Sequence, residues 1–288
     1  MKTRIISALV GTVLLLGVLF CPYGWAFVVA VPILAAIASW ELLHNTGIMK
    51  NLVVCIGSML FSALTVLAIG AAESVATMAQ PYYPMPADAL VPLVLVLLAA
   101  YMVFMAIAWL ICRKGISLAT FCRALLLTLY ATLGFGCLAA LRVAHFGGLV
   151  PVIFVLVIAW MSDTGAYFTG VLFGKHKMAP VISPKKTWEG FFGGWVFAIG
   201  CAALLAVICN WAYASVLHFS VFRFAIIAAV LAPVSVLGDL LASLIKRRCG
   251  IKDYGNLMPG HGGVMDRFDS VVFIAPLLYV ILWIADIA

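Results

Sequence analysis

Charged residues are scarce in this sequence, which has only 10 acidic and 17 basic side chains among 288 residues, or 9% charged. A soluble domain carries roughly a quarter charged residues, so the composition argues against one. C-x-x-C pairs are also missing although the chain has eight cysteines. Their absence argues against a disulfide framework or a thiolate metal site. What the chain has instead is apolar side chains, at 66% of all residues, as expected within a bilayer.

The apolar residues form long runs. About 20 apolar residues span the hydrocarbon core as a helix, and such runs lie near 5–20, 25–43, 52–71, 90–111, 119–141, 149–172, 190–213, 222–245 and 270–287. We therefore predict an all-α, polytopic membrane protein with about nine transmembrane helices. The first run follows Lys2 and Arg4 and could be a signal peptide, but it lacks an A-x-A cleavage pattern, which favours an uncleaved helix.

The chain divides into two regions of different character. Residues 1–150 contain about five spans with few polar groups between them. Residues 151–288 contain two basic loops, 173–189 and 246–269, and nearly all the carboxylates expected within spans. We interpret the first as an N-terminal transmembrane region and the second as the catalytic region.

The distribution of basic residues predicts the orientation. With nine spans and a cytoplasmic N-terminus, 14 of the 17 Lys and Arg face the cytoplasm, whereas Arg142 and Arg223 lie on the far side and Arg123 lies in the fifth span. This is the positive-inside pattern. The net charge of +7 therefore reflects topology and an anionic ligand at the cytoplasmic face, and nucleic acid is not an expected partner.

Carboxylates inside spans are costly and often functional. Asp163 lies in the sixth predicted span, and Asp239 lies near the end of the eighth. Asp239, Ser243 and Lys246 follow i, i+4, i+7 spacing and share one helix face. They form a polar stripe that leads to the cytoplasmic loop. A charge pair inside the protein, such as Asp239 with a Lys, is the structural alternative.

Residues 243–269 hold five of the basic and three of the acidic residues. Asp266 and Asp269, at i, i+3, would project from one side of the ninth helix. Carboxylates beside phosphate-seeking basic groups suit Mg²⁺, which leaves further positions to water and phosphate oxygens. The alternative for Asp269 is a helix N-terminal charge, and the alternative for Asp266 is a solvated surface pair with Arg267.

A glycine-rich turn precedes Asp266. Glycines flank His261 on both sides, with Gly262 and Gly263 following it. They allow positive φ and an exposed nest of N–H groups for phosphate, and His261 could donate a hydrogen bond or act as a general base. A flexible turn is the alternative.

The other basic loop includes residues 183–190, SPKKTWEG. Ser183 is expected to be an N-cap, so that the helix start and the side chains of Lys185 and Lys186 favour an anion. A surface pair between Glu189 and Lys185 is the alternative for that acid. Glu41 and Arg123 lie in no motif, and we assign neither to the chemistry.

Residues 155–288 resemble the phosphatidate cytidylyltransferases, or CDP-diacylglycerol synthases. The resemblance rests on residues 243–259 (SLIKRRCGIKDYGNLMP), with shifted spacing at 255–259, and on HGGVMDRFD at 261–269. SDT at 162–164 and residues 183–190 are similar to two further stretches of that family.

The resemblance implies that the protein transfers the cytidylyl group of CTP to phosphatidic acid in the bilayer. It also implies an Mg²⁺-dependent enzyme, with a second cation left open, that forms a homodimer. Asp239 and Asp266 would be metal carboxylates, with Asp163 and Asp269 as further candidates. Catalytic roles are expected for Asp163, Lys186, Asp239 and Asp266. Substrate-binding roles are expected for Ser183, Lys185, Ser243, Lys246, Arg247, Lys252, His261, Gly262, Gly263 and Arg267.

Two other readings stay open. One is another membrane transferase or kinase that uses CTP or a phospholipid, although the D-G-x2-A-R motif of CDP-alcohol phosphotransferases is not found. The other is an ion-coupled transporter with ion sites at Asp163 and Asp239. Transporters often contain inverted repeats, and no repeat is visible in this sequence.

Overall fold

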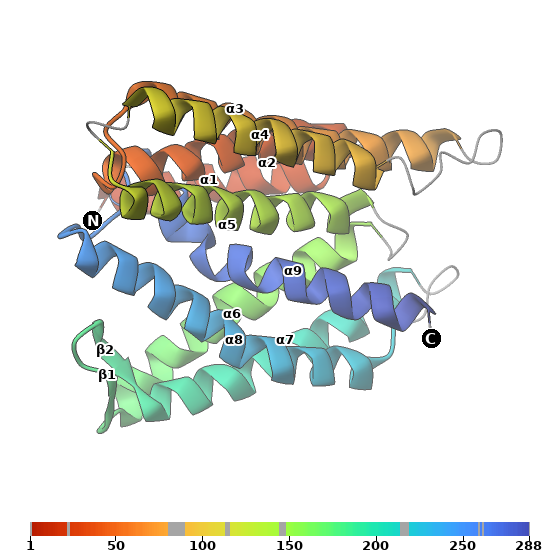
Figure 1. Ribbon diagram of the computed structural model, residues 1–288. Coiled ribbons are helices and arrows are strands. Elements are labelled where there is room, and N and C mark those ends of the chain that lie inside the picture. The colour runs from red at the N-terminus through yellow and green to blue at the C-terminus, as the bar shows by residue number, and fades with distance from the viewer. Residues whose placement is uncertain are drawn as a thin grey trace. The chain divides into compact units, whose positions relative to one another are not determined.

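The computed structural model describes residues 2–21, 24–79, 90–112, 116–143, 148–213, 219–258, 260 and 262–287 (Figure 1). The helices in these ranges are α1 (Lys2–Leu19), α2 (Trp25–Trp40), α3 (Leu52–Ala79), α4 (Leu90–Cys112), α5 (Leu118–Val143), α6 (Leu149–Phe173), α7 (Trp188–Ala212), α8 (Val221–Arg248) and α9 (Met265–Ile287). A π-helical turn, η2 (Glu41–Asn45), extends α2, and two strands, β1 (Lys177–Ala179) and β2 (Ser183–Thr187), lie between α6 and α7.

Within the described ranges, eight of these helices are long and apolar enough to cross a membrane. The exception is α1, which contributes only the shorter apolar segment Leu9–Leu19. The all-α, polytopic prediction is confirmed, and the predicted spans agree with the helices apart from their ends. Helix α8 continues to Arg248 and so carries the predicted polar stripe on one unbroken helix.

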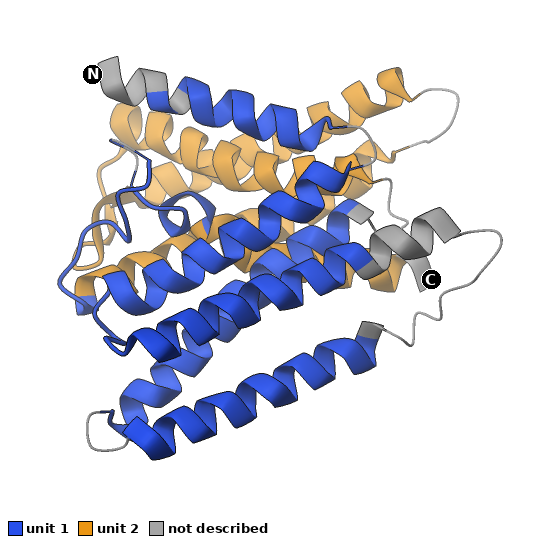
Figure 2. Cartoon of the chain, turned by 90° about the horizontal axis from the view of Figure 1, so that it is seen from above, with its two compact units in different colours: residues 1–144, 248–268 blue, residues 145–247, 269–288 orange. Residues whose placement is uncertain are grey.

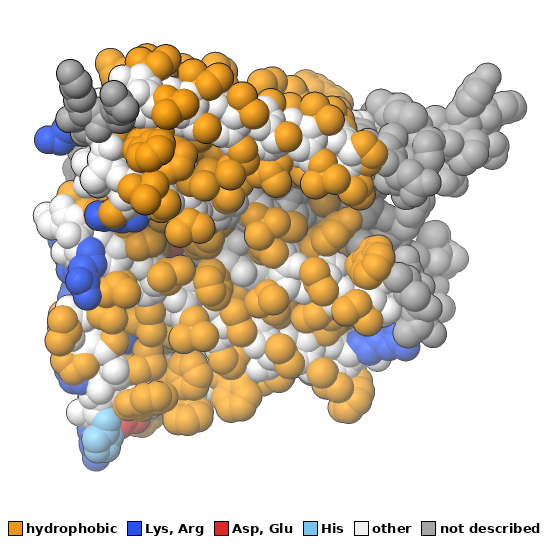
Figure 3. Space-filling model, in the orientation of Figure 1, with side chains coloured by type: hydrophobic (Ala, Val, Ile, Leu, Met, Phe, Trp, Pro, Cys, Tyr) orange, Lys and Arg blue, Asp and Glu red, His pale blue; other side chains and the backbone are white. Residues whose placement is uncertain are grey.

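The helix flanks explain why this composition needs a bilayer. Many large apolar side chains are exposed, among them Leu110, Ile111 and Val196. Figure 3 shows hydrophobic side chains along the visible helix flanks and Lys and Arg side chains near helix ends. Apolar patches of this extent mark membrane contact rather than a water-facing surface.

The chain forms two compact units, coloured separately in Figure 2. Unit 1 contains Met1–Ala144 and Arg248–Phe268, and unit 2 contains His145–Arg247 and Asp269–Ala288. In unit 1, α3 packs against α2, α4 and α5. Hydroxyl groups bridge these helices, as where Thr132 donates to Ser62 at 3.0 Å. Buried hydroxyls need such partners because bilayer and protein interior offer no water.

In unit 2, glycines let α6 and α7 pack in close contact. A Cβ atom at Gly190 would lie 2.7 Å from the Ala166 carbonyl oxygen, and one at Gly194 would collide with the Ser162 carbonyl oxygen. These are distances that real Cβ atoms do not adopt, so only glycine fits. Gly190 and Gly194 are small residues four apart, a spacing that favours close helix packing in membranes.

The loop between α6 and α7 differs from the prediction. Ser183 is not a helix N-cap, because residues 183–187 form β2 and pair antiparallel with β1, with Ala179 opposite Ser183. The helix begins five residues later, at Trp188. Thr187 is the N-cap, and its hydroxyl oxygen accepts the N–H of Gly190 at 3.1 Å. Pairing with β1 gives hydrogen-bond partners to backbone groups of β2 that would otherwise bond within a helix starting at Pro184.

Candidate active site

Unit 2 brings together carboxylates from two helices that pack closely. A Cβ atom at Gly238 of α8 would lie 2.7 Å from the Cβ of Phe273 on α9. This close approach sets the residue after Gly238, Asp239, beside the first turns of α9. Asp269 on α9 is only 8% exposed, and it interacts electrostatically with Asp239, Lys246 and Asp163. Asp163, Asp239 and Asp269 therefore share one electrostatic environment.

Two lysines accompany these carboxylates. Lys186 of β2 places its Nζ 2.5 Å from Oδ2 of Asp239, with side-chain exposures of 21% and 24%. The other carboxylate oxygen of Asp239 accepts the hydroxyl of Ser243 at 3.3 Å, as expected for i, i+4 on one face. The structural alternative, a pair between Asp239 and a Lys, is thus present. The pair lies with two further acids, Asp163 and Asp269, which a simple ion pair does not need.

The Lys186 ammonium has hydrogen-bonding capacity left over. Its Nζ is shielded from solvent and makes no hydrogen bond of regular geometry among the described residues. An ammonium has three donors, and the ion pair with Asp239 engages one oxygen. Burying unmet donors is costly, so this position favours an additional anionic group such as a phosphate.

The formal charges of this group favour a cation as well. If all three carboxylates are ionised, Asp163, Asp239 and Asp269 together carry three negative charges against the two positive charges of Lys186 and Lys246, which leaves one negative charge. Carboxylate oxygens are the protein ligands that Mg²⁺ uses, usually one or two of them, with water and phosphate completing the shell. The described residues contain no group of three or more His, Cys, Asp or Glu arranged as a full metal site.

The remaining predicted residues of unit 2 surround this group less closely. Successive strand residues face opposite ways, so Lys185 is exposed while Lys186 is half-buried. Arg247 directs its Nε to the carbonyl oxygen of Ile182 at 3.5 Å, which ties the hairpin turn to the end of α8. The substrate-binding roles of Ser183, Lys185 and Arg247 remain predictions.

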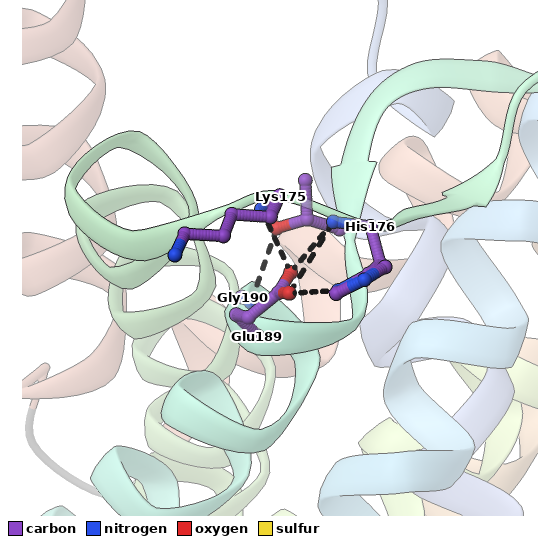
Figure 4. A network of polar contacts seen from close by, with 5 residues as sticks. Lys175, His176, Glu189 and Gly190 are labelled. Carbon is purple, nitrogen blue, oxygen red and sulfur yellow. Dashed lines mark hydrogen bonds and ion pairs between the residues drawn. The ribbon is translucent and has the colours of Figure 1, made fainter.

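Glu189 has a different partner from the predicted one. Its carboxylate accepts the N–H of Lys175 at 3.1 Å and of His176 at 3.2 Å, and lies 2.6 Å from Nδ1 of His176 (Figure 4). The surface pair between Glu189 and Lys185 is therefore wrong. Glu189 instead links the first turn of α7 to the segment between α6 and β1, and so holds the hairpin that carries Lys186.

Replacing Glu189 by Gln tests this supporting role. The amide keeps one acceptor for the Lys175 and His176 N–H groups but loses the charge that faces His176. Because the pair is solvated, we expect the turnover rate to fall a few-fold at most, with little change in thermal stability. Steady-state rates for Glu189→Gln measure the effect, and an inactive variant would show that Glu189 acts in the chemistry.

In unit 1, Asp266 organises the glycine-rich loop. Its Oδ2 accepts the N–H of Tyr254 at 2.7 Å and of Gly263 at 3.0 Å. Gly260 and Gly262 have φ of +79° and +85°, which confirms the expected positive φ. The N–H of Gly263 is not exposed to a phosphate, because Asp266 accepts it. The predicted N–H nest is wrong at that residue, since a neighbouring carboxylate satisfies the donor first.

Sequence reasoning missed Glu41. Its side chain is 2% exposed, and its two oxygens accept the N–H groups of Val264 at 3.0 Å and Met265 at 2.8 Å. One signal was available in the sequence, a carboxylate within a predicted span. The structure adds that Glu41 lies in a π-helical turn, a feature often found at functional sites. The partners of Glu41 are backbone N–H groups far along the chain, so no sequence motif beside Glu41 indicates them.

The other predicted residues of unit 1 lie on or near the same loop. Lys252 and Arg267 are exposed, as expected of groups that meet a ligand from solution. His261 lies outside the described residues. The roles of Lys252, His261, Gly262 and Arg267 in substrate binding, and of Asp266 in metal binding, remain predictions.

Comparison with known proteins identifies the family. The model of the cytidylyltransferase family matches residues 2–285, nearly the whole chain. The chain belongs to the cytidylyltransferase family. Among curated members, a phosphatidate cytidylyltransferase of Staphylococcus epidermidis RP62A is 46% identical over 135 residues, covering 47% of this chain and 50% of that protein. One from Bacillus subtilis 168 is 42% identical over 135 residues, covering 47% and 48%.

A longer match is with a phosphatidate cytidylyltransferase of Staphylococcus haemolyticus JCSC1435. It is 38% identical over 164 residues, which cover 57% of this chain and 59% of that protein. The matched part spans about half the length of the curated relatives. Family membership therefore extends over both units of this cytidylyltransferase-family chain, whereas detailed likeness to named enzymes covers about half of it.

Proposed function

We propose that this protein transfers the cytidylyl group of CTP to phosphatidic acid, giving CDP-diacylglycerol and pyrophosphate. One observation carries the proposal: in unit 2, three acids and Lys246, on helices apolar enough to cross a membrane, gather with Lys186 of β2. Polar clusters inside spans are retained for function. Membership in the family and the names of the relatives support this choice of reaction.

The reaction is a displacement at phosphorus. A phosphate oxygen of phosphatidic acid forms a bond to the α-phosphorus of CTP, the bond between that phosphorus and the bridging oxygen breaks, and pyrophosphate leaves with the electron pair. The attacking phosphate is already ionised near neutral pH, so no strong general base is required. Positioning and charge neutralisation dominate such reactions. Lys186, with unmet donors in a shielded position, is suited to binding a phosphate oxygen there.

We propose Mg²⁺ as the cofactor, held in unit 2 by Asp239 together with Asp163 or Asp269. For Asp266 of unit 1 we propose a metal-binding role separately, because the resemblance implies one. When bound, the ion would neutralise charge on the triphosphate and the departing pyrophosphate. Lys246 and Ser243 lie on the same face of α8 as Asp239. They would orient that carboxylate and bind further phosphate oxygens.

We also propose that the protein lies in a bacterial inner membrane with its active site facing the cytoplasm. The bacterial relatives and the excess of Lys and Arg on one predicted side support this. CTP supplied outside the vesicle should then be used by inside-out membrane vesicles and not by sealed right-side-out vesicles. The homodimer implied by the resemblance remains a prediction that light scattering of the detergent-solubilised protein would test.

The proposed function is tested with the purified full chain in detergent micelles that contain phosphatidic acid. We expect pyrophosphate release that requires CTP, phosphatidic acid and Mg²⁺ together, with CDP-diacylglycerol formed in equal amount. EDTA should abolish release, and added Mg²⁺ should restore it. Release that ignores phosphatidic acid would contradict the substrate. No release under any of these conditions, with ion flux in proteoliposomes, would favour a transporter.

A further inference from the structure

Unit 1 contains a buried carboxylate that the reaction chemistry above leaves unused. Glu41 is one of the least exposed polar side chains of the described residues. It lies in the π-helical turn η2, and its partners lie 223 and 224 residues further along the chain. Such a carboxylate inside a span is costly unless its oxygens are well bonded.

Both oxygens of Glu41 bond to the start of α9. Oε1 accepts the N–H of Val264 and Oε2 that of Met265. The first N–H groups of a helix have no partner within the helix, and the helix dipole favours a negative charge there. Glu41 therefore caps α9 from a distant segment, immediately before Asp266.

The glycines of the loop fit around this carboxylate. A Cβ atom at Gly255 would lie 2.5 Å from Oε1 of Glu41, and one at Gly263 would collide with the same carboxylate. Asn45, at the other end of η2, donates its Nδ2 hydrogen to the carbonyl oxygen of Tyr254 at 2.9 Å. Tyr254 and Gly263 are also the residues whose N–H groups Asp266 accepts.

We propose that Glu41 is a positioning residue that fixes residues 254–258 and 262–264 and the first turn of α9, and thereby orients Asp266. The inference rests on the proposed function, in which Asp266 is a metal carboxylate. Groups that hold a metal ligand in place affect metal affinity or activity by about 10–100-fold when they are lost. Glu41 would act through Asp266 without touching the substrate.

Glu41→Gln is the sharpest test, because both carboxylate oxygens are used. The amide can accept one N–H, but its NH₂ group must then face the other N–H. We expect turnover to fall about 10–100-fold, the Mg²⁺ concentration for half-maximal rate to rise, and the KM for phosphatidic acid to stay nearly constant. The matched control is Ser62→Ala, which removes a buried hydrogen bond of the same unit away from this loop.

Hydrogen exchange gives a readout that does not depend on activity. In Glu41→Gln, the amides of residues 254–258 and 262–265 should exchange faster than in the wild type, and Ser62→Ala should leave them unchanged. Unchanged exchange in Glu41→Gln would overturn the anchoring of the loop. Faster exchange with full activity and an unchanged Mg²⁺ requirement would overturn the positioning role. An inactive wild type would instead contradict the proposed function.

A double-mutant cycle tests the contact itself. Gly255→Ala should lower activity in the wild type, because its new methyl group meets Oε1 of Glu41. In the Glu41→Ala background, Gly255→Ala should lower activity only slightly further, because the obstructing carboxylate oxygen is absent. Neighbouring residues that share a contact show such non-additivity. Additive effects of Gly255→Ala and Glu41→Ala would show that the two residues act independently and would overturn the assignment.

Discussion

Asp239→Asn should lower CTP-dependent pyrophosphate release by about 10³-fold, the upper range for losing one group that stabilises charge in an active site. The amide oxygen can still accept the Ser243 hydroxyl, so α8 should keep its local structure. The negative charge that faces Lys186 disappears, and with it a carboxylate that could bind a metal. The turnover rate at saturating CTP measures the effect. Thermal denaturation in detergent checks that the variant is folded.

Two further variants separate chemistry from the ion pair. Asp286→Asn makes the same change at the far end of α9, away from the first turns, and should retain wild-type rates. Removing both charges of a pair is better tolerated than removing one, so Asp239→Asn combined with Lys186→Met should be more stable than either single variant. It should stay inactive. Recovery of activity in the double variant would reduce Asp239 to a structural partner of Lys186.

Helix positions and the stripe on α8 could be predicted from sequence because both depend on local rules. Span length follows from bilayer thickness, and i, i+4 spacing placed Ser243 next to Asp239, as the 3.3 Å contact confirms. The start of α7 could not be predicted in the same way. Ser183 and Thr187 are both good caps, and pairing of β2 with β1 decided between them.

Within the candidate site, the sequence indicated the residue types better than their partners. A carboxylate in a span is visible without a structure, and so is a glycine that can adopt positive φ. Whether a carboxylate bonds a lysine, a metal or backbone N–H groups depends on tertiary contacts. Glu41 shows this most clearly, because its partners are main-chain donors that any residue type supplies.

Asp266 presents the other large expected effect, and two variants distinguish its roles. Asp266→Asn can keep one oxygen directed to the N–H groups of Tyr254 and Gly263, so the loop should retain its conformation while the charge is lost. Asp266→Ala removes that acceptor as well, and leaves two backbone donors without the partner seen here. If Asp266 binds Mg²⁺, both variants should lose turnover by about 10³-fold.

The two variants distinguish the roles, because a purely structural role of Asp266 would give them different activities. In that case Asp266→Asn would keep nearly full activity, and only Asp266→Ala would be impaired and destabilised, since unmet buried donors cost about 1–3 kcal/mol each. Rates measured across a range of Mg²⁺ concentrations add a second criterion. Partial rescue of Asp266→Asn by high Mg²⁺ would show weakened metal binding, whereas wild-type rates at low Mg²⁺ would exclude a metal role for Asp266.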